Sequence, residues 1–517
     1  MDQQMENSRQ LLIGELIKRN SRKMPNKDAF VFGSRRYSYS EANKRINRLA
    51  NGLCGLGIKK GDKISVLFLN SVELVECYFA ISKIGAVVVP LNFRLVGAEL
   101  IYQITQSDSK IVVFGKAFEE TILSIKNNIP DIEHFIGLEQ AKSDAIIDYD
   151  TFLQDHTDEE PSVIIDDDDP AFIVYTSGTT GKPKGAVLTH KNLLMDSLNL
   201  LAEINFPRDP RWLCVPPLFH AAALGLFITI TMQGGTTIIV EQFVPQDIPP
   251  ILFEEKISFL FLVPAMWIFL LQVPNIGDYD LSALKIGVTG AAIMPIEVKK
   301  QILERFPEMQ IFDVFGQSEM SPCTTMLKHA DTIRKPGSVG QRIVNVEARI
   351  VDRNGNDVSV GEVGEIVYRG PTTMKEYYKK PKETEEAMDQ GWFHSGDLVR
   401  EDEEGYIYVV DRAKDMIISG GENIYAAEVE EVIFAHPKVL EVAIIGIPDD
   451  KWGEAVKAVV VPKEGEKISE DEIISHCQAN LASYKKPKSV EIIEILPRNA
   501  AGKVMKFKLR EQYQLKK

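Results

Sequence analysis

The sequence predicts an α/β fold, with a large N-terminal domain of layered α/β subdomains and a small, distorted antiparallel β-barrel, followed by a small mobile α+β C-terminal domain. The chain has 517 residues, and because single cores stop growing near about 250–300 residues, at least two domains are expected. Helical and strand patterns alternate in the first part, which is typical of layered sheets. Near residue 345 the pattern changes to short strands separated by Gly, Asn and Asp turns.

The first part of the chain alternates amphipathic helical segments with short apolar strands. In order these are helix Tyr39–Leu56, strand Lys63–Leu69, helix Glu73–Gly85 and strand Ala86–Pro90. Two further strands, Ala171–Tyr175 and Ala186–Thr189, are expected on either side of a loop rich in Gly, Thr and Lys. This order predicts helices packed in layers on largely parallel sheets.

Two long uncharged stretches favour buried elements over membrane helices. Leu213–Val240 contains prolines and paired glycines, which favours a loop, a buried helix and then a strand. Ile257–Gly277 is broken by Pro264, which favours strand Ser258–Val263 and then a helix from Ala265. A membrane helix needs about 20 uninterrupted apolar residues, so no transmembrane segment is expected. Peripheral membrane contact stays open.

The second part of the chain predicts a small β region and a compact C-terminal domain. Residues 345–410 carry the short strands of an antiparallel sheet or small barrel. The segments expected after Asp411 are helix Ala427–Ala435, strands Val442–Ile447 and Ala455–Val461, and helix Glu470–Leu481. We therefore expect a large domain over residues 1–412 and a small domain over 413–517.

Composition excludes some classes of partner. A net charge of −15 argues against nucleic acid, because nucleic-acid binding needs a basic surface. The five cysteines are scattered and odd in number, which indicates reduced cytosolic thiols. The first ten residues show no secretory pattern, so a cytoplasmic protein is expected, as a monomer or a homodimer.

The loop between the two central strands has the composition of a polyphosphate-binding loop. It reads Thr176, Ser177, Gly178, Thr179, Thr180, Gly181, Lys182, Pro183, Lys184 and Gly185. Glycines let backbone N–H groups approach an anion, hydroxyls add donors and lysines supply charge. A Walker A loop needs a Ser or Thr after its Gly-Lys pair, whereas Pro183 follows Lys182 here. An ordinary hairpin turn is the alternative interpretation.

This loop closely resembles the phosphate loop of the adenylate-forming (AMP-binding) enzyme superfamily, which includes the acyl-CoA synthetases. Further segments resemble the motifs of that family, in order along the chain. They are Gly287–Ala292, Phe315–Glu319, Gly391–Asp397, the hinge-like Asp411–Ile418 and the lysine loop Leu496–Lys503. Ser318 and Ser395 stand where the family usually has Thr, and Phe315 stands where it usually has Tyr.

The resemblance implies roles for the residues of these motifs. Lys503, Glu319 and Ser318 would be catalytic, Glu319 and Thr176 would hold Mg²⁺, and Lys414 would be the hinge. The remaining ATP- or AMP-binding residues would be Ser177, Gly178, Thr179, Thr180, Gly181, Lys182, Lys184, Gly290, Ala291, Ala292, Asp313, Phe315, Gly316, Asp397 and Arg412. Hard cations prefer carboxylate and phosphate oxygens, and a carboxylate suits the two hydroxyl donors of a ribose.

The branch of the family depends on the acceptor and the acid. Gly420, Gly421 and Glu422 resemble the CoA-binding segment of acyl-CoA ligases. Because no carrier domain follows Lys503, we expect a free-standing CoA ligase. The acyl pocket implied by the resemblance would be lined by His220, Val263, Ala265, Ala291 and Ala292. These side chains are small or apolar apart from His220, so an apolar acid tail is expected.

The expected reaction joins a carboxylic acid to CoA, with ATP converted to AMP and pyrophosphate through an acyl-adenylate. A medium- or long-chain fatty acid is the first expectation for the substrate, with an aryl or hydroxycinnamate acid as the alternative. Transfer of the acyl group to a carrier protein, or reaction of the adenylate with oxygen, stays open. A non-catalytic nucleotide or acyl-CoA sensor is a rival hypothesis, which the joint presence of Lys503, Glu319, Asp397 and Arg412 disfavours.

Overall fold

A computed structural model describes residues 9–138, 145–176, 182–292, 294–419, 422–449, 452–498 and 504–514. The chain divides into two compact units. Unit 1 comprises Met1–Thr176, Pro183–Ala348 and Tyr368–Phe393, and unit 2 comprises Ser177–Lys182, Arg349–Val367 and His394–Lys517. The domain boundary expected between residues 412 and 413 stays a prediction.

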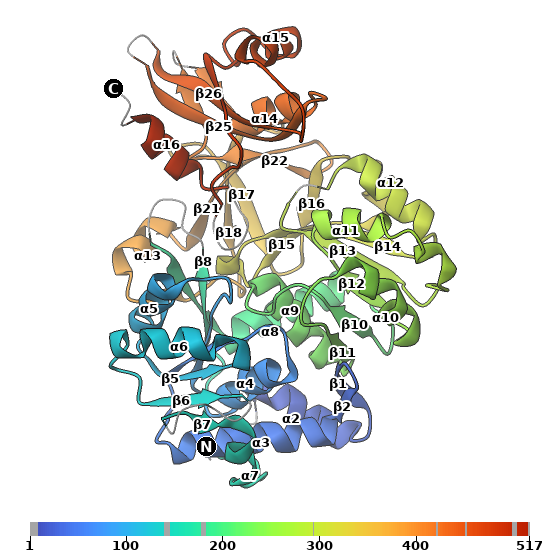
Figure 1. The fold of residues 1–517 in the computed structure, drawn as a ribbon, viewed down its shortest axis with the longest axis vertical. Helices are drawn as coiled ribbons and strands as arrows, with labels where there is room; N and C mark the ends of the chain where they lie inside the picture. The colour runs from blue at the N-terminus through green and yellow to red at the C-terminus, as the bar shows by residue number, and fades with distance from the viewer. Residues whose placement is uncertain are drawn as a thin grey trace. The chain divides into compact units, whose positions relative to one another are not determined.

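One sheet of unit 1 follows the order β19-β9-β8-β4-β3-β5-β6-β7, of which Figure 1 labels β8, β5, β6 and β7. Its strands are β3 (Lys63–Leu67), β4 (Val87–Pro90), β5 (Ser109–Phe114), β6 (His134–Gly137), β7 (Ile147–Asp148), β8 (Pro170–Thr176), β9 (Lys184–Thr189) and β19 (Glu376–Tyr377). The pairs from β8 to β7 are parallel, whereas β9 is antiparallel to both β8 and β19. The phosphate-loop segment therefore joins two antiparallel strands, as predicted.

A second series of strands in unit 1 follows the order β16-β15-β14-β13-β12-β10-β11-β1-β2. Its strands are β1 (Asp28–Phe32), β2 (Arg35–Ser38), β10 (Arg211–Cys214), β11 (Thr236–Ile239), β12 (Phe259–Phe261), β13 (Ile286–Gly290), β14 (Gln310–Gly316), β15 (Cys323–Leu327) and β16 (Ser338–Arg342). The pairs from β14 to β1 are parallel, which places the carboxyl ends of β13 and β14 at one sheet edge.

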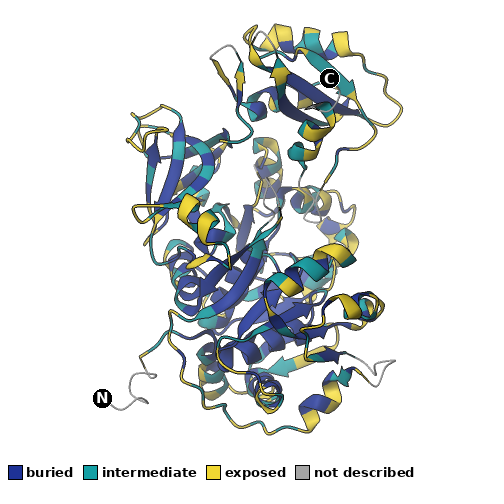
Figure 2. Cartoon of the chain, turned by 90° about the vertical axis from the view of Figure 1, so that its left-hand side faces the viewer, coloured by how far each residue is buried: buried dark blue, intermediate teal, exposed yellow. Residues whose placement is uncertain are grey.

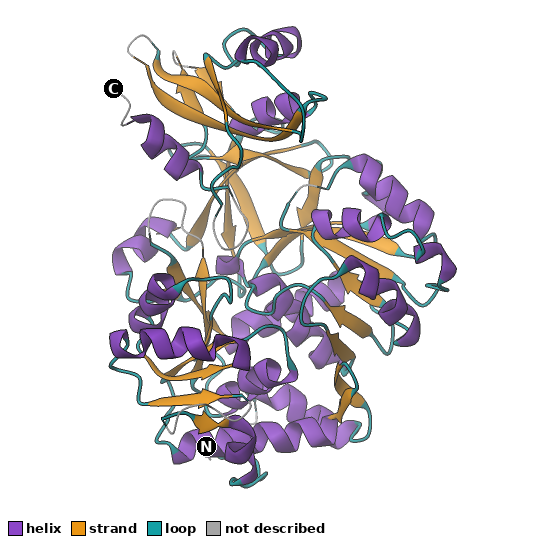
Figure 3. Ribbon diagram, in the orientation of Figure 1, coloured by secondary structure: helices purple, strands orange, loops and turns teal. Residues whose placement is uncertain are grey.

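Helices pack against both series of strands (Figure 3). The helix α4 (Val72–Lys83) is buried along its whole length and contacts β3, β4 and β1, so it lies between the two series. The other helices of unit 1 are α2 (Ile13–Lys23), α3 (Tyr39–Gly55), α5 (Gly97–Gln106), α6 (Glu119–Ile125), α7 (Tyr149–Gln154), α8 (His190–Glu203), α9 (Ala221–Gln233), α10 (Ile248–Glu254), α11 (Pro264–Leu271), α12 (Ile296–Arg305) and α13 (Pro381–Ala387). The central strands are mostly buried (Figure 2), as expected for parallel sheets covered on both faces.

The secondary structure predicted for the two uncharged stretches, Leu213–Val240 and Ile257–Gly277, is confirmed. Helix α9 and strand β11 occupy the first stretch, and strand β12 and helix α11 occupy the second. Within the described residues, none of the helices combines the length and hydropathy that a membrane crossing needs. All five cysteines are free thiols, as predicted.

The β region predicted over residues 345–410 consists of adjacent short strands in the order β17-β18-β21-β22. They are β17 (Glu347–Val351), β18 (Gly364–Arg369), β21 (Trp392–Glu401) and β22 (Ile407–Arg412), with β20 (Met388–Asp389) paired to the start of β21. β21 and β22 are antiparallel, and their register sets Asp397 opposite Arg412.

The C-terminal residues of unit 2 form a sheet with helices on both faces. Its strands follow the order β24 (Glu422–Ile424), β23 (Ile417–Ser419), β26 (Gly453–Pro462) and β25 (Val439–Asp449), with β27 (Ser489–Ile492) also paired to β26. Ile444 and Val460 pack with α14 (Ala426–Phe434) and α15 (Glu470–Asn480). Ile445 and Val461 pack with α16 (Lys506–Gln514). Neighbouring residues of a strand thus face opposite sides of the sheet. The positions of α14, β25, β26 and α15 confirm the predicted α+β pattern.

Candidate active site

The ends of β13 and β14 expose backbone beside small residues. Gly290 pairs with Val314, and a Cβ on Gly290 would lie 2.6 Å from the Val314 carbonyl oxygen. Ala291 follows with a φ of +67°, a left-handed conformation that is uncommon for a residue with a Cβ. Both Ala291 and Ala292 are exposed. Such an edge at the carboxyl ends of parallel strands is a frequent ligand position.

The motif Phe315–Glu319 turns sharply after β14. A Cβ on Gly316 would lie 1.9 Å from the Pro322 carbonyl oxygen, so only glycine fits there. The buried Thr324 hydroxyl donates to the Phe315 carbonyl at 3.1 Å. The chain then forms a short 3-10 helix, η5 (Ser318–Met320). The turn thereby fixes the backbone that carries Ser318 and Glu319.

Glu319 is a buried carboxylate whose described partner is a neutral hydroxyl. Its side chain is 8% exposed, and the Tyr377 hydroxyl donates to Oε1 at 2.8 Å. Among the described residues, no lysine, arginine or histidine forms an ion pair with Glu319. Glu319 thus has no cationic partner in the part of the chain that the structure describes.

The stem of the phosphate loop lies beside Glu319. Thr176 and Lys184 are paired across β8 and β9, and the Thr176 hydroxyl donates to the Lys184 carbonyl at 3.3 Å. Lys184 Nζ lies 4.2 Å from the centroid of the Tyr377 ring. The structure therefore brings Lys184 and Glu319 to the same tyrosine, Tyr377, and Thr176 is the strand partner of Lys184. Lys182 is exposed, and the predicted residues Ser177, Gly178, Thr179, Thr180 and Gly181 lie outside the described residues.

Asp313, a predicted nucleotide-binding residue, forms a buried ion pair. Lys299 Nζ donates to Asp313 Oδ2 at 2.7 Å, and the Thr332 hydroxyl donates to the same oxygen at 3.3 Å. Burial raises the pKa of Asp313, and the Lys299 charge opposes that shift. The carboxylate thus anchors α12 to β14, and any contact of residue 313 with a nucleotide stays a prediction.

Two buried residues hold the segment before His220. Tyr78 lies in α4, and Asn70 lies two residues before that helix. Asn70 Oδ1 accepts from the Leu218 N–H at 2.9 Å, while its amide donates to the Pro216 carbonyl at 3.1 Å. The Tyr78 hydroxyl donates to the Leu218 carbonyl at 3.1 Å. His220 then precedes α9, and its ring lies 4.2 Å from that of Phe219 between centroids.

The other predicted acyl-pocket residues occupy ends of elements in unit 1. Val263 is partly buried directly before α11, and Ala265 is exposed in its first turn. Ala291 and Ala292 are exposed after β13. Each is thus near a helix or strand end, where a small-molecule site is common.

In unit 2, the motif around Asp397 pairs it with Arg412. Arg412 Nε lies 2.6 Å from Asp397 Oδ1, and the Asp397 side chain is 3% exposed. The Asp397 N–H donates to the Ser395 hydroxyl at 3.0 Å. Glu365 bridges the same strand, accepting from the Gly396 N–H at 2.8 Å and contacting His394 Nδ1 at 2.9 Å. These bonds fix the carboxylate of Asp397.

The hinge-like segment forms a tight turn between β22 and β23. The Asp415 and Met416 N–H groups both donate to the Arg412 carbonyl, at 2.9 and 3.1 Å. Burial lowers the pKa of Lys414 to about 8, and Asp415 opposes that shift. Arg510 of α16 donates to Asp415 at 2.6 Å, which ties the turn to the helix that follows Lys503.

Three predicted residues of this part cannot be placed. Gly420 and Gly421, expected at the CoA-binding segment, lie outside the described residues, and so does the predicted catalytic Lys503. Glu422 is exposed at the start of β24. Their roles stay predictions.

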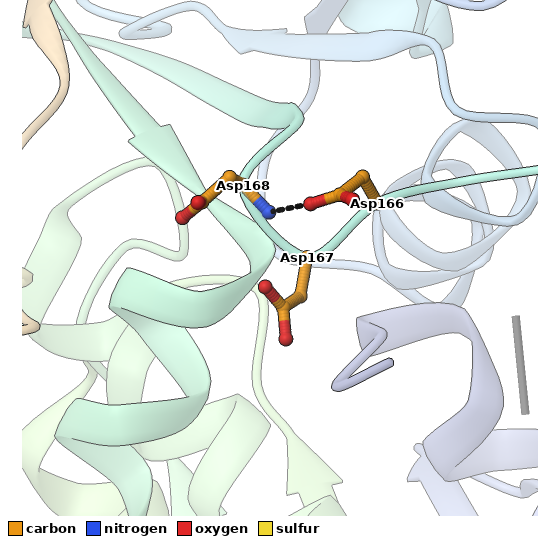
Figure 4. Close-up of side chains that lie close together, drawn as sticks. All are labelled: Asp166, Asp167 and Asp168. Atoms are coloured by element: carbon orange, nitrogen blue, oxygen red, sulfur yellow. Dashed lines mark hydrogen bonds between the residues drawn. The ribbon is translucent and has the colours of Figure 1, made fainter. Parts of the chain in front are cut away.

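An acidic turn precedes β8. The Asp168 N–H donates to Asp166 Oδ1 at 2.9 Å, and the three carboxylates of Asp166, Asp167 and Asp168 lie close together (Figure 4). Asp167 accepts from the Leu11 N–H at 3.3 Å, and Asp168 lies 3.7 Å from Lys191 Nζ. This acidic turn thus anchors the N-terminal segment.

Comparison with known proteins decides the family. The protein-family model named AMP-binding enzyme matches residues 17–378. The family model named AMP-binding enzyme C-terminal domain matches residues 428–503. The chain belongs to the AMP-binding enzyme family.

Relatives of this AMP-binding enzyme include CoA ligases over their full length. A feruloyl-CoA synthase from Amycolatopsis sp is 38% identical over 502 residues, covering 97% of this chain and 99% of that protein. The long-chain-fatty-acid–CoA ligase FadD13 from Mycobacterium tuberculosis is 37% identical, covering 97% and 98%. The o-succinylbenzoate coenzyme A synthetase MenE from Bacillus subtilis, solved in complex with ATP and magnesium ion, is 28% identical with a TM-score of 0.85, covering 96% and 99%.

These findings confirm the predicted family, fold class and enzyme class. The chain is an AMP-forming acid–CoA ligase with a large N-terminal and a small C-terminal domain. The acid is not decided by them, because the two curated relatives named above differ in the acid that their names give.

Two observations fit the binding of Mg²⁺ and a nucleotide to this AMP-binding enzyme. Glu319 offers a carboxylate without a cationic partner among the described residues, which suits a hard cation. The amide Nε2 of Gln317 is buried and has no partner among the described residues, which suits a ligand that accepts a hydrogen bond. Both groups flank Ser318.

Three supporting residues were missed by the sequence analysis. Tyr377 contacts Glu319, Glu365 holds the strand of Asp397, and Asn70 holds the segment before His220. The signal for Asn70 is a polar residue two positions before the largely apolar helix α4, but its partner is 148 positions away in sequence. Nothing in the local sequence around Tyr377 or Glu365 points to those partners.

Proposed function

We propose that this acid–CoA ligase activates a carboxylic acid with an apolar tail, a medium- or long-chain fatty acid in the first place. The observation that supports the adenylation chemistry is the contact of both Lys184 and Glu319 with Tyr377 in unit 1, with Thr176 paired to Lys184. The apolar tail is supported by the candidate pocket residues Val263 and Ala265, which carry no charge.

In the first step the acid carboxylate attacks the α-phosphorus of ATP, and pyrophosphate leaves. Thr176 and Lys184 hold the β- and γ-phosphates, and Ser318 contacts the α-phosphate. Lys503 bridges the carboxylate and the α-phosphate, where it stabilises the charge that grows in the transition state. Glu319 and Thr176 hold Mg²⁺, which when bound neutralises phosphate charge.

Asp397 and Arg412 serve the ribose in this proposal. Asp397 accepts hydrogen bonds from the ribose hydroxyls, and Arg412 keeps its carboxylate charged and oriented. The 2.6 Å contact between Arg412 Nε and Asp397 Oδ1 supports that second role.

In the second step the CoA thiol attacks the acyl carbonyl, and AMP leaves. The small domain rotates at Lys414 and withdraws Lys503, while Gly420, Gly421 and Glu422 contact CoA. The Asp415 and Met416 N–H groups donate to the Arg412 carbonyl. The turn is therefore short, and a change of backbone angles at Lys414 alone would redirect the chain that follows.

An aryl acid such as a hydroxycinnamate is the second candidate substrate. The Phe219 and His220 rings, with centroids 4.2 Å apart, offer aromatic surface at the predicted pocket, and aromatic pairs favour stacked or edge contacts. The 38% identity to a feruloyl-CoA synthase supports the same candidate.

The acid is tested by CoA-dependent AMP formation with a panel of octanoate, palmitate, ferulate and indoleacetate at equal concentrations. A fatty acid should give the highest kcat/KM. A preference of more than tenfold for ferulate would overturn the fatty-acid proposal in favour of the aryl one. AMP release without added CoA would argue for a different acceptor.

The role of Lys503 is tested by measuring the two half-reactions separately. Lys503→Ala should lower acid-dependent pyrophosphate exchange about 10²-fold or more, the scale seen when one charge-stabilising donor is removed. Thioester formation from pre-made acyl-AMP should survive. Lys508→Ala, at an exposed lysine of α16, is the matched control and should change neither rate. Equal losses in both half-reactions of Lys503→Ala would contradict the assigned role.

A further inference from the structure

The contact between Tyr377 and Glu319 links two segments that the sequence motifs treat separately. The Tyr377 hydroxyl donates to Glu319 Oε1 at 2.8 Å, and both side chains are buried, at 4% and 8% exposure. The two residues are 58 positions apart. A buried bond of this kind is strong where the surrounding dielectric is low.

Backbone hydrogen bonds fix both members of the pair. On one side, β19 pairs with β9, and the Tyr378 N–H donates to the Gly185 carbonyl at 2.8 Å. On the other side, the Met374 N–H donates to the Glu319 carbonyl at 2.7 Å. The Tyr377 N–H itself donates to the Thr384 hydroxyl at 3.0 Å. The backbone that carries Tyr377 is therefore held by β9, the strand that follows the phosphate loop, and this backbone places the Tyr377 hydroxyl.

The charges around the pair favour a phenol that only donates. A carboxylate can only accept a hydrogen bond, so the Tyr377 hydroxyl is the donor in the contact with Glu319 Oε1. Lys184 lies over the ring, 4.2 Å from its centroid, as a cation–π contact. Within the described residues, Lys184 and Glu319 form no ion pair. The lysine contacts the ring face of Tyr377, whereas the carboxylate contacts its hydroxyl.

We propose that Tyr377 is a positioning residue for the divalent cation that accompanies ATP. By donating to Oε1 it fixes the orientation of the Glu319 carboxylate and directs the other oxygen, Oε2, to the cation. It also prevents Lys184 from pairing with Glu319, which leaves the lysine for phosphate and the carboxylate for metal. The inference rests on the proposed function, in which Glu319 holds Mg²⁺.

The test is Tyr377→Phe, which removes the hydroxyl and keeps the ring. Binding of Mn²⁺·ATP is followed by the electron paramagnetic resonance signal of manganese as the protein is titrated. Loss of a residue that orients a metal ligand costs about 10–100-fold in metal affinity, so the apparent Kd should rise within that range. In pyrophosphate exchange, the Mg²⁺ concentration for half-maximal rate should rise by a similar factor, with the KM for the acid unchanged.

The neighbouring tyrosine provides a matched control. The Tyr378 hydroxyl donates to Asp108 at 2.8 Å in an exposed position. Tyr378→Phe makes the same chemical change one residue away and should bind Mn²⁺·ATP as the unchanged protein does. A weakening of manganese binding in Tyr378→Phe equal to that in Tyr377→Phe would overturn the inference.

Glu319→Gln, measured in parallel, separates this inference from the function on which it rests. If Glu319→Gln weakens Mn²⁺·ATP binding and Tyr377→Phe does not, the inference is wrong and the proposed function stands. If neither variant weakens binding, the metal role of Glu319 fails and the inference fails with it. If Tyr377→Phe lowers the melting temperature and the rate with manganese binding unchanged, Tyr377 is only structural, which also overturns the inference.

Discussion

Glu319 in unit 1 and Asp397 in unit 2 are both buried carboxylates in predicted nucleotide-binding motifs, yet their partners differ. Glu319 accepts from a neutral phenol at 2.8 Å. Asp397 lies 2.6 Å from the guanidinium of Arg412. Their exposures are similar, at 8% and 2%, so depth alone does not distinguish them.

The difference between the two carboxylates matches the ligands proposed for them. A carboxylate held by a neutral donor keeps its full charge for a cation such as Mg²⁺. A carboxylate beside an arginine has its charge balanced, and it can then accept from neutral hydroxyls of a ribose. We therefore expect the protein partners of these two acids to indicate whether the ligand of each is charged or neutral.

The largest effect is expected for Glu319→Gln, which removes the charge and keeps the shape. Without the charge the cation loses a ligand, and acid-dependent pyrophosphate exchange should fall about 10²-fold or more at saturating ATP. Glu376→Gln, at an exposed glutamate of β19, is the control and should retain activity. If Glu319→Gln changes only the KM for ATP, its carboxylate serves nucleotide binding and not the transition state.

A smaller effect is expected for Asp397→Asn. The amide still accepts one hydrogen bond but no longer balances Arg412, so the KM for ATP should rise about tenfold, which corresponds to about 1.4 kcal/mol. The rate at saturating ATP should change little.

Asp402→Asn, in the turn between β21 and β22, is the control for Asp397→Asn, because Asp402 accepts from the Glu404 and Tyr406 N–H groups of that turn. It should leave the KM unchanged. An Asp397→Asn protein that is less stable, but binds ATP normally, would show that the Arg412 pair is structural.

Much of the fold was predictable because its signals are local. The apolar runs of β4, β25 and β26 have the length and composition of buried strands, and the register of β21 with β22 joins two residues that the motifs had already named. Local pattern is enough where neighbouring residues alternate between two packed faces.

The residues that support the site were not predictable in the same way. Tyr377 and Glu319 are 58 positions apart, and Asn70 and Leu218 are 148 apart. Such contacts depend on how strands are ordered, which no local pattern contains. The same holds for the buried pair of Asp313 with Lys299, whereas the nucleotide contact expected of Asp313 stays a prediction.

A third buried carboxylate, Asp196 of α8, extends the comparison. It is 0% exposed, and its Oδ1 accepts from the Cys323 N–H at 3.1 Å. Its Oδ2 has no partner among the described residues. Burial raises the pKa of Asp196 well above its usual range, and the Cys323 hydrogen bond only partly opposes that shift. Burial therefore favours the neutral form of this carboxyl group in the folded protein.

Asp196→Asn makes the same acid-to-amide change. Of the three variants it should have the smallest effect on activity, and near pH 4 also the smallest effect on stability. Above the pKa of the unfolded chain, the folded state still binds a proton that the unfolded state has released. Stability of the unchanged protein should therefore fall as pH rises toward the folded pKa. Asp196→Asn carries no such proton, so its stability relative to the unchanged protein should increase over that range.

Urea midpoints of both proteins between pH 4 and 9 measure this difference in stability. Pyrophosphate exchange should stay within about twofold, since a surviving fold keeps its site. A constant loss of stability at every pH would mean that Asp196 is ionised in the folded protein, and that burial alone does not decide which of the three carboxylates carries charge.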